Sequence, residues 1–125
     1  MEKTDLLQRS EFLNSSFDEV DNILILIAHP TRFKILILLL NGPMSFQSLM
    51  GEIKIQKSAL ANHLTKLKNS YLIEKVQYGT YRLTEDGNKY LEYLESAFKE
   101  SKMRRKQIED SKQRLEMTKS FLERK

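Results

Sequence analysis

Residues 56–66 carry side chains whose types and spacing suit contact with a nucleic acid. Leu60, Leu64 and Leu67 recur at helical spacing and share one face, while the opposite face carries amide, hydroxyl and ammonium groups. Carboxamides can pair with the edge of adenine, and ammonium groups can neutralise phosphates. The pattern predicts a helix that enters the major groove of DNA; the alternative is an amphipathic helix whose polar face is merely solvated. The predicted contact residues are Gln56, Lys57, Ser58, Asn62, His63, Thr65 and Lys66.

The flanking segments predict a helix before this one and a β-hairpin after it. Ser45 precedes an apolar pattern over residues 46–53, which is typical of a short helix with a serine N-cap. Residues 54–57 have the length of a helix-turn-helix connection. Two apolar runs, 72–76 and 81–83, flank a tight turn at Tyr78-Gly79. The predicted fold class is therefore mainly α with a small β-hairpin wing, a winged helix-turn-helix.

The predicted wing and the start of the first helix add further candidates for DNA contact. Because the wing is short, Gln77, Tyr78 and Thr80 are expected to reach the DNA backbone rather than the bases. Lys75 and Arg82 are candidates for phosphate contact, although a pair of exposed cations is also common on a hairpin. The complete set outside residues 56–66 is Ser45, Gln47, Lys75, Gln77, Tyr78, Thr80 and Arg82.

Three motifs in this order resemble the signature of winged-helix transcription regulators of the ArsR and MarR type. They are His29–Leu36, Ser58–Leu67 and Tyr81–Gly87, and the match covers roughly Asp18 to Leu94. The resemblance implies a double-stranded DNA-binding regulator in which His63 contacts the DNA backbone and Arg32 supports the fold or meets a phosphate. From the residues alone, His63 is as well explained by a structural hydrogen bond, and a salt bridge to an acid of the helix before it is the favoured explanation for Arg32.

Tyr71 departs from this family pattern, because it stands where the family usually has a glycine that ends the recognition helix. Either the helix is capped in another way, or Tyr71 accepts a strained backbone. The sequence also lacks the cysteines, and the pairs of histidine and acid, that some members use for metal sensing.

Composition argues against several other functions. The chain has 125 residues and no cysteine, which excludes disulfides and thiolate chemistry. The two histidines, His29 and His63, are too few to form a metal site. No combination of catalytic residues is evident, and the 4 glycines form no phosphate-binding loop. No cofactor, metal or enzymatic activity is expected, and any small-molecule effector is unknown. The longest apolar region, residues 23–40, is interrupted by charge and proline, so we expect no membrane span and a cytoplasmic location.

The charge distribution agrees with a nucleic-acid partner. The net charge is +4, the first 22 residues are acidic, and residues 54–82 carry six cations against one acid, Glu74. A second basic excess lies beyond Phe98. Positive charge therefore gathers on the predicted helix-turn-helix and wing, where phosphates are expected.

The remaining segments predict three parts: an N-terminal arm or short helix (1–16), a DNA-binding domain (17–94), and a long C-terminal dimerisation helix (85–125) that overlaps the end of the domain. Residues 17–28 predict a helix capped by Ser16, and Pro30 opens the next helix, which runs to about Leu40. Thr84 is expected to cap the last helix. The expected apolar stripe of the first helix is Val20, Ile23, Leu24 and Ile27, and the expected core residues of the second are Ile35, Leu36, Leu38, Leu39 and Leu40.

The C-terminal helix shows a partial heptad pattern. Leucine or isoleucine recurs at sevens from Leu94 to Leu122 with one gap at Ser101, whereas the companion row turns basic after Phe98. A long helix of this kind needs a partner, so we expect a homodimer, with parallel and antiparallel pairing both open. The predicted dimer-interface residues are Ile23, Ile27, Leu91, Leu94, Phe98, Ile108, Leu115 and Leu122.

Together these observations predict a homodimeric regulator, more specifically a repressor, that reads an inverted repeat through successive major grooves about 34 Å apart. Two alternatives stay open. One is sequence-tolerant architectural DNA binding, suggested by the basic C-terminal helix and the short wing. The other is a winged-helix protein-interaction module.

Overall fold

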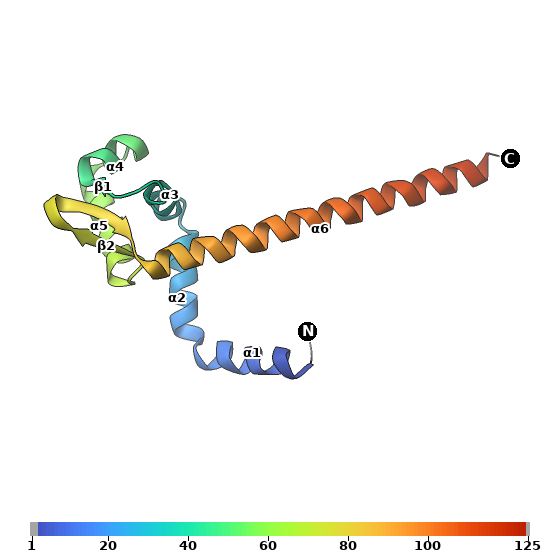
Figure 1. Ribbon diagram of the computed structural model, residues 1–125, viewed down its shortest axis with the longest axis horizontal. Coiled ribbons are helices and arrows are strands. Elements are labelled where there is room, and N and C mark those ends of the chain that lie inside the picture. The colour runs from blue at the N-terminus through green and yellow to red at the C-terminus, as the bar shows by residue number, and fades with distance from the viewer. Residues whose placement is uncertain (1–2, 125) are drawn as a thin grey trace. The chain divides into compact units, whose positions relative to one another are not determined.

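The computed structural model describes residues 3–124 and is mainly helical, with one small antiparallel sheet (Figure 1). Its structure confirms the predicted fold class, a winged helix-turn-helix with a long C-terminal helix. The chain divides into two compact units after Asn88, within the last helix, and each unit is described by itself. The elements are α1 (Lys3–Ser15), α2 (Phe17–Ala28), α3 (Pro30–Leu39), β1 (Met44–Ser45), α4 (Phe46–Ile53), α5 (Lys57–Asn69), β2 (Ile73–Val76), the 3₁₀ turn η1 (Gln77–Gly79), β3 (Thr80–Leu83) and α6 (Glu85–Glu123).

Leucine and isoleucine side chains from α3, α4, α5 and the start of β2 form the core of the first unit. Two of the five expected core positions of α3 are wrong, because Leu40 is 50% exposed and Leu38 is only half-buried. Consecutive helical residues point in different directions, so a run of apolar residues cannot all face one core. The most deeply buried side chains are Ile35, Leu36, Leu49, Leu60, Leu64, Leu67, Leu72 and Ile73.

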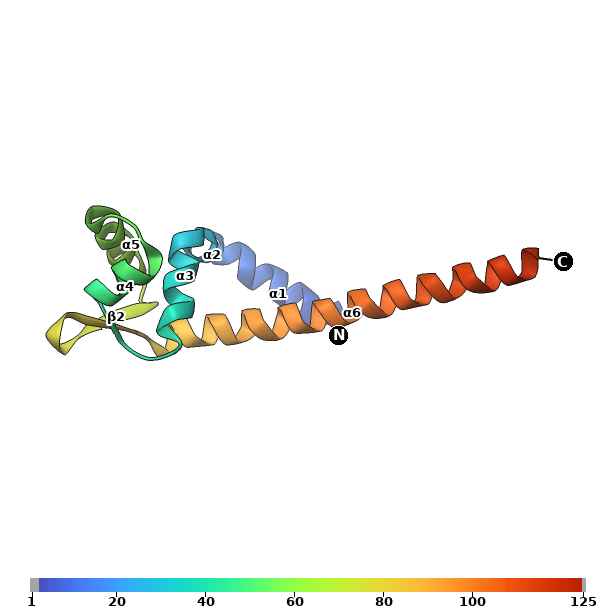
Figure 2. The same ribbon diagram turned by 90° about the horizontal axis from the view of Figure 1, so that it is seen from above.

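Helix α2 differs from its predicted stripe. Its only buried residue is Leu26, and Leu24 is 61% exposed. The predicted cap is also wrong: the Ser16 side chain makes no capping bond, because its backbone lacks the extended conformation that turns a serine hydroxyl toward the first amides. Helix α1 contacts α2 but buries no residue. In Figures 1 and 2, α1 lies on the side of α3 away from α4 and α5.

The wing contains one strand more than predicted. The sheet order is β1-β3-β2, with both pairs antiparallel, and β1 pairs through Met44↔Tyr81 and Ser45↔Thr80. Ser45 then caps α4 as expected, since its Oγ accepts from the Ser48 N–H at 3.1 Å. The start of α4 is therefore tied directly to the wing.

Of the two alternatives expected for Tyr71, the structure shows the strained backbone conformation. Its φ is 61°, and the amides of Tyr71 and Leu72 donate to the carbonyls of Lys68 and Leu67 at 3.0 and 3.1 Å. This pair of bonds is a Schellman motif with a tyrosine in the left-handed position. The Tyr71 side chain is 74% exposed, so the ring itself meets no steric obstacle.

The first turn of α6 packs against Tyr71 and Leu72, the residues that follow α5. As predicted, Thr84 caps the helix, because its Oγ1 accepts from the Gly87 N–H at 3.0 Å. The same hydroxyl donates to the Tyr71 carbonyl at 2.5 Å. A Cβ on Gly87 would lie 2.1 Å from the Leu72 carbonyl oxygen, so this close approach requires glycine.

No single helix among residues 3–124 is long and apolar enough to cross a membrane. Only α2 and α3 taken together reach the necessary length and composition, and they are bent by 82°.

Candidate nucleic-acid interface

Helix α5 separates an apolar face from a polar one, as the sequence predicts. Leu60, Leu64 and Leu67 are at most 2% exposed and fix the helix to the core. The helix begins at Lys57, with Gln56 in the N-cap position and no side chain capping its first amides. Uncapped amides at a helix N-terminus attract phosphate. Six of the seven predicted contact residues are exposed, namely Gln56, Lys57, Ser58, Asn62, Thr65 and Lys66.

Within this face the predicted residues differ in what they can still bind. The Thr65 hydroxyl donates to the Ala61 carbonyl at 2.9 Å, so its proton is engaged and only its oxygen can accept. Asn62 makes no hydrogen bond through its side chain to any described residue, which leaves both its donor and its acceptor available. A free carboxamide on an exposed helix face is the group that can recognise adenine in a bidentate way.

Two alanines on α5 were not among the predicted contact residues. Ala59 and Ala61 are exposed beside Ser58 and Asn62. A small side chain lets the helix backbone approach a groove closely, and an alanine methyl can contact the methyl group of thymine. The sequence signal was the pair of alanines on either side of the buried Leu60, which leaves no bulky side chain on the exposed face at this point.

The predicted residues at the start of α4 have unequal roles. The Ser45 hydroxyl serves as the α4 cap and also donates to the Ser48 Oγ at 3.0 Å. Gln47, in the first turn, is exposed. The Ser45 hydroxyl is therefore engaged in hydrogen bonds within the protein, whereas the Gln47 side chain is exposed to solvent.

The tip of the wing is a tight turn with an exposed aromatic ring. Tyr78 is 96% exposed and has a φ of 63°, and Gly79 follows with a φ of 68°. Gln77 is also exposed, and its carbonyl accepts from the Thr80 hydroxyl at 3.1 Å. The turn thus projects Gln77 and Tyr78 at the end of the sheet, while Thr80 holds the turn together.

The two wing cations have different surroundings. Arg82 lies opposite Glu74 in the β2–β3 register, and its Nε is 2.5 Å from the Glu74 Oε1. Lys75 lies over the Tyr81 ring, with its Nζ 5.9 Å from the centroid, and contacts no carboxylate among residues 3–124. Lys75 is therefore the more available of the two for a phosphate.

Arg32 is buried and joins three elements. It is 7% exposed; its Nε donates to the Leu26 carbonyl at 2.7 Å and its Nη2 to the Ile25 carbonyl at 3.4 Å. Its Nη1 lies 3.3 Å from the Nδ1 of His63. The salt bridge to an acid of α2, which the residues alone had favoured, is absent within the described chain. The reason is that the carbonyls at the end of α2 are the nearer acceptors and carry its negative dipole.

His63 belongs to α5 and lies half-buried beside Arg32. Because a guanidinium can only donate, the His63 Nδ1 must accept, so the ring is neutral with its proton on Nε2. Its ring centroid is 4.7 Å from that of His29, whose Nδ1 accepts from the Thr31 N–H. Burial, then the proximity of His29, Arg32 and Lys66, lowers the pKa of His63 below its usual 6.5.

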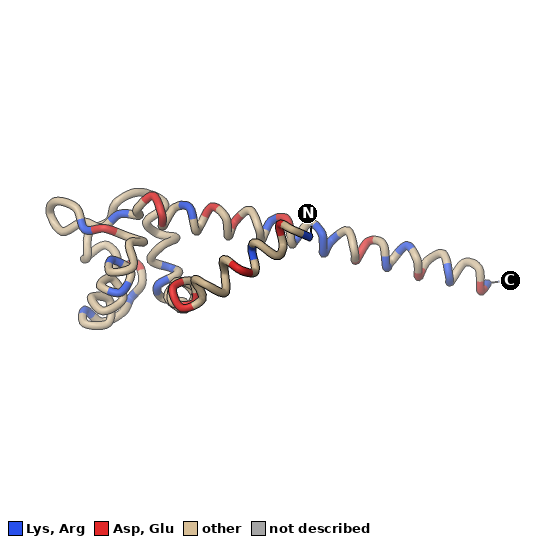
Figure 3. Tube along the Cα trace, turned by 90° about the horizontal axis from the view of Figure 1, so that it is seen from below, with Lys and Arg blue, Asp and Glu red and all other residues tan. Residues whose placement is uncertain are grey.

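Basic residues lie on the same elements as the predicted DNA-contact residues. Figure 3 shows lysine and arginine along α5 and in the wing, with few acidic residues among them. No group of three or more His, Asp or Glu side chains within residues 3–124 lies close enough together to hold a metal ion.

Comparison with known proteins gives results that agree with this geometry. Residues 29–75, from the N-cap of α3 to β2, match the model of the bacterial regulatory protein family arsR. The chain is similar to the transcriptional repressor BigR from Xylella fastidiosa, with 30% identity over 61% of this chain and 78% of the other and a TM-score of 0.55. It is also similar to HlyU from Vibrio cholerae, with 26% identity over 68% and 95% of the two chains and a TM-score of 0.56.

A third structure supports the fold alone. It is the homodimeric winged helix-turn-helix domain of a possible ArsR-family regulator from Mycobacterium bovis, with 22% identity over 70% of this chain and 84% of the other and a TM-score of 0.62. Comparison with curated proteins gave no significant match.

Proposed function

We infer that this chain, which belongs to the arsR family of bacterial regulatory proteins and carries the DNA-binding domain of a transcriptional regulator, is a repressor that acts as a homodimer on an inverted repeat. Family members are regulators rather than enzymes.

The observation that carries the proposal is the exposed polar face of α5. Its side chains offer an uncommitted carboxamide at Asn62, flanked by the small residues Ala59 and Ala61. Lys57 and Lys66 lie toward the two ends of the face and can neutralise phosphates on either side of a groove. In this arrangement Asn62 reads a base edge, while the lysines hold the helix in the groove.

The wing and the half-buried His63 contribute contacts to the DNA backbone. Lys75, which contacts no carboxylate among residues 3–124, is placed to meet a phosphate, and Gln77 and Tyr78 extend from the tip. His63 carries its proton on Nε2, the nitrogen that does not face Arg32, and can donate it to a phosphate oxygen. Arg32 acts through His63 by fixing its tautomer.

The homodimer is supported by apolar side chains that a single chain leaves in water. Leu94 is 46% exposed, and Phe98, Ile108, Leu115 and Leu122 range from 55% to 72%. Ile23 and Ile27 of α2 are half-buried. Leu91, at 7%, has little area left to add. Burying such side chains against a second copy stabilises each by about 1.5–3 kcal/mol when burial is complete.

Repression is supported by the likeness to BigR, which is described as a transcriptional repressor. A two-fold symmetric dimer presents two copies of α5 to half-sites separated by about 34 Å, one turn of DNA, and the site is then an inverted repeat. A bound dimer of this kind blocks a promoter by occupying it.

Selection of duplexes from a random pool tests the proposal. The enriched sequences should contain an inverted repeat, and insertion of half a helical turn between its halves should abolish tight binding, because one half-site then faces away. Enrichment of direct repeats or single sites would contradict the symmetric arrangement. Failure to enrich any sequence, with binding to all duplexes, would instead favour architectural DNA binding, and no binding at all would favour a protein-interaction module.

A further inference from the structure

The exposed face of α5 carries three side-chain methyl groups around one carboxamide. Ala59, Ala61 and Thr65 are exposed, and so is Asn62, which lies among them. Residues three or four apart are neighbours on a helix surface, so Ala59 adjoins Asn62, and Thr65 adjoins both Ala61 and Asn62. These four side chains therefore form one continuous patch opposite the buried leucines.

Thr65 contributes a methyl group to this patch rather than a free hydroxyl. Its hydroxyl donates to the Ala61 carbonyl at 2.9 Å, within the same helix. Because the hydroxyl proton is engaged there, the methyl group is the part of the side chain that no hydrogen bond occupies. Together with the Cβ atoms of Ala59 and Ala61, it gives the patch three apolar contacts close to the helix backbone.

These groups match what an A·T pair presents in the major groove. Thymine presents its C5 methyl group there, and alanine and threonine methyls make apolar contacts with it. Adenine presents one acceptor and one donor, with which a carboxamide can pair in a bidentate way. Residues 58–65 cover about 10 Å of helix, roughly the length of three base pairs. The patch therefore has the size to read a short run of A·T pairs.

The side chains that best recognise G·C pairs are missing from α5. Arginine is the commonest reader of guanine, and carboxylates accept from the amino group of cytosine. The sequence of α5 contains neither an arginine nor an acidic residue. Lysine can also meet guanine, but Lys57 and Lys66 lie toward the two ends of the face, where phosphates are expected. Ser58 can bond to any base and so favours none.

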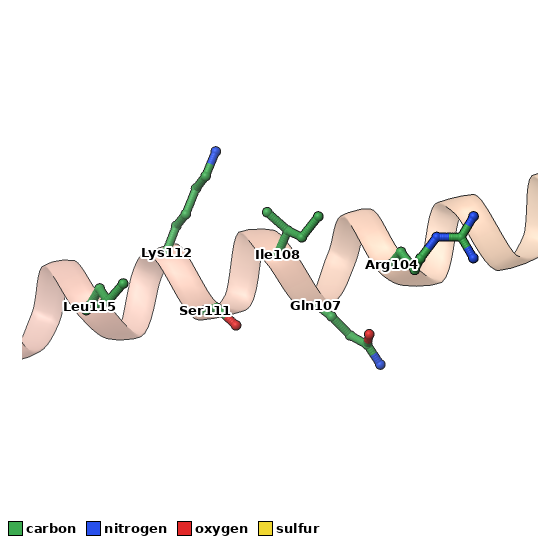
Figure 4. Close-up of a pocket in the computed structure, with 6 residues that line it drawn as sticks. All are labelled: Arg104, Gln107, Ile108, Ser111, Lys112 and Leu115. Carbon is green, nitrogen blue, oxygen red and sulfur yellow. The ribbon is translucent and has the colours of Figure 1, made fainter. Parts of the chain in front are cut away.

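The arginines of the chain belong to other elements. Arg32 is buried and donates to carbonyls at the end of α2, and Arg82 of the wing pairs with Glu74. The others belong to α1 or to α6 and the residue after it. Figure 4 shows one of them, Arg104, projecting from α6, and its Nη1 lies 3.8 Å from the Glu100 Oε2. The exposed face of α5 therefore meets a groove without an arginine of its own.

We propose that α5 recognises the C5 methyl groups of thymine through Ala59, Ala61 and Thr65, while Asn62 pairs with an adenine between them. The proposal rests on the proposed function and names the bases that each half-site contains. The half-site has a core of A·T pairs and no guanine contacted by α5. Thr65 takes part through its methyl group, and its hydroxyl stays on the Ala61 carbonyl.

Replacement of thymine by deoxyuridine tests methyl recognition, because deoxyuridine lacks only the C5 methyl group. The probe is a duplex enriched from a random pool, in which each thymine of the half-site is replaced in turn. Fluorescence-anisotropy titrations with the full chain compare every substituted duplex with its parent. We expect binding to weaken about fourfold for each contacted methyl group that is lost, the effect of removing one buried methylene group. Thymines outside the contacted positions should show no effect.

Thr65→Ser removes the protein's side of one such contact and keeps the hydroxyl that bonds to the Ala61 carbonyl. The matched control is Thr80→Ser in the wing, where the hydroxyl likewise donates to a backbone carbonyl, that of Gln77, at 3.1 Å. Thr65→Ser should become insensitive to deoxyuridine at one thymine of each half-site, whereas Thr80→Ser should keep the wild-type pattern. Each variant is compared with itself on the two duplexes, so a small change in folding cancels.

Three results would overturn the proposal. They are enriched half-sites with a G·C core, equal affinity of the wild type for the thymine and deoxyuridine duplexes, and a wild-type pattern in Thr65→Ser. In each of them tight binding to the enriched duplex would still support a sequence-specific regulator, so only the methyl recognition would fail. If no duplex is enriched at all, the proposed function fails together with this inference.

Discussion

At the scale of single residues, the proposed interface has some groups that read bases and others that hold phosphates. Asn62→Ala removes the free carboxamide, so it should weaken binding to a selected duplex by about 1–3 kcal/mol, roughly 5- to 150-fold, and leave binding to random DNA nearly unchanged. Lys66→Ala is the comparison, because it should weaken both duplexes and reduce the salt slope by about one. Titrations of each variant with both duplexes measure the difference. An equal loss on both duplexes for Asn62→Ala would count against base readout.

The half-buried His63, beside Arg32 and His29, predicts that stability depends on pH. Because the pKa of His63 is lowered below 6.5 in the folded protein, the unfolded chain binds more protons between the two values. The stabilising contribution is complete above about pH 6.5 and is lost as the pH falls through the lower folded value. Urea unfolding across pH 7.5 to 5 should therefore show a fall in unfolding free energy that is smaller in His63→Gln. An identical pH slope in both proteins would exclude His63 as its source.

At the scale of elements, the contact between the start of α6 and Leu72, just before β2, depends on one glycine. Gly87→Ala places a methyl group 2.1 Å from the backbone oxygen of Leu72, so we expect a loss of about 1–3 kcal/mol of unfolding free energy. Gly51→Ala is the matched control, since nothing lies within 4 Å of its Cβ position and alanine favours helix α4 by about 0.4–1 kcal/mol. Urea unfolding should move the two midpoints in opposite directions. Similar midpoints for the two variants would contradict the close approach.

Elements whose signals are local could be predicted from the sequence. The leucines of α5 and the Ser45 and Thr84 caps follow from spacing and short-range hydrogen bonding, and the structure contains all of them. The uncommitted state of Asn62 could not be foreseen, because it depends on which neighbours fold against it. The contact roles assigned to Asn62 and its neighbours stay predictions.

Features that depend on distant parts of the chain were predicted poorly. Arg32 was expected to meet an acid, but the end of α2 presents carbonyls to it and α5 presents His63. The helix α2 is apolar on several sides, so its pattern alone could not show that Leu26 is the buried residue. The third strand, β1, has only two residues and no pattern of its own.

At the scale of the whole molecule, dimerisation should depend on one side of α6. Leu115→Glu places a charge among the apolar residues of the predicted dimer interface and should shift the chain toward a monomer of 14.8 kDa. Met117→Glu changes a residue of nearly equal exposure, 71% against 72%, on another side and should leave the dimer intact. Light scattering at matched concentrations compares them. A monomeric wild type, or equal dissociation of both variants, would remove α6 as the dimer interface.

Base reading by α5 is tested by a fluorescence-anisotropy titration of the full chain with a duplex enriched from a random pool and with a random duplex, each at two salt concentrations. If α5 reads bases, the enriched duplex binds more tightly, and its affinity depends less on salt than that of the random duplex. Equal affinity for both duplexes, with the same salt dependence, would show that the charged surface binds DNA without reading it and would contradict the account.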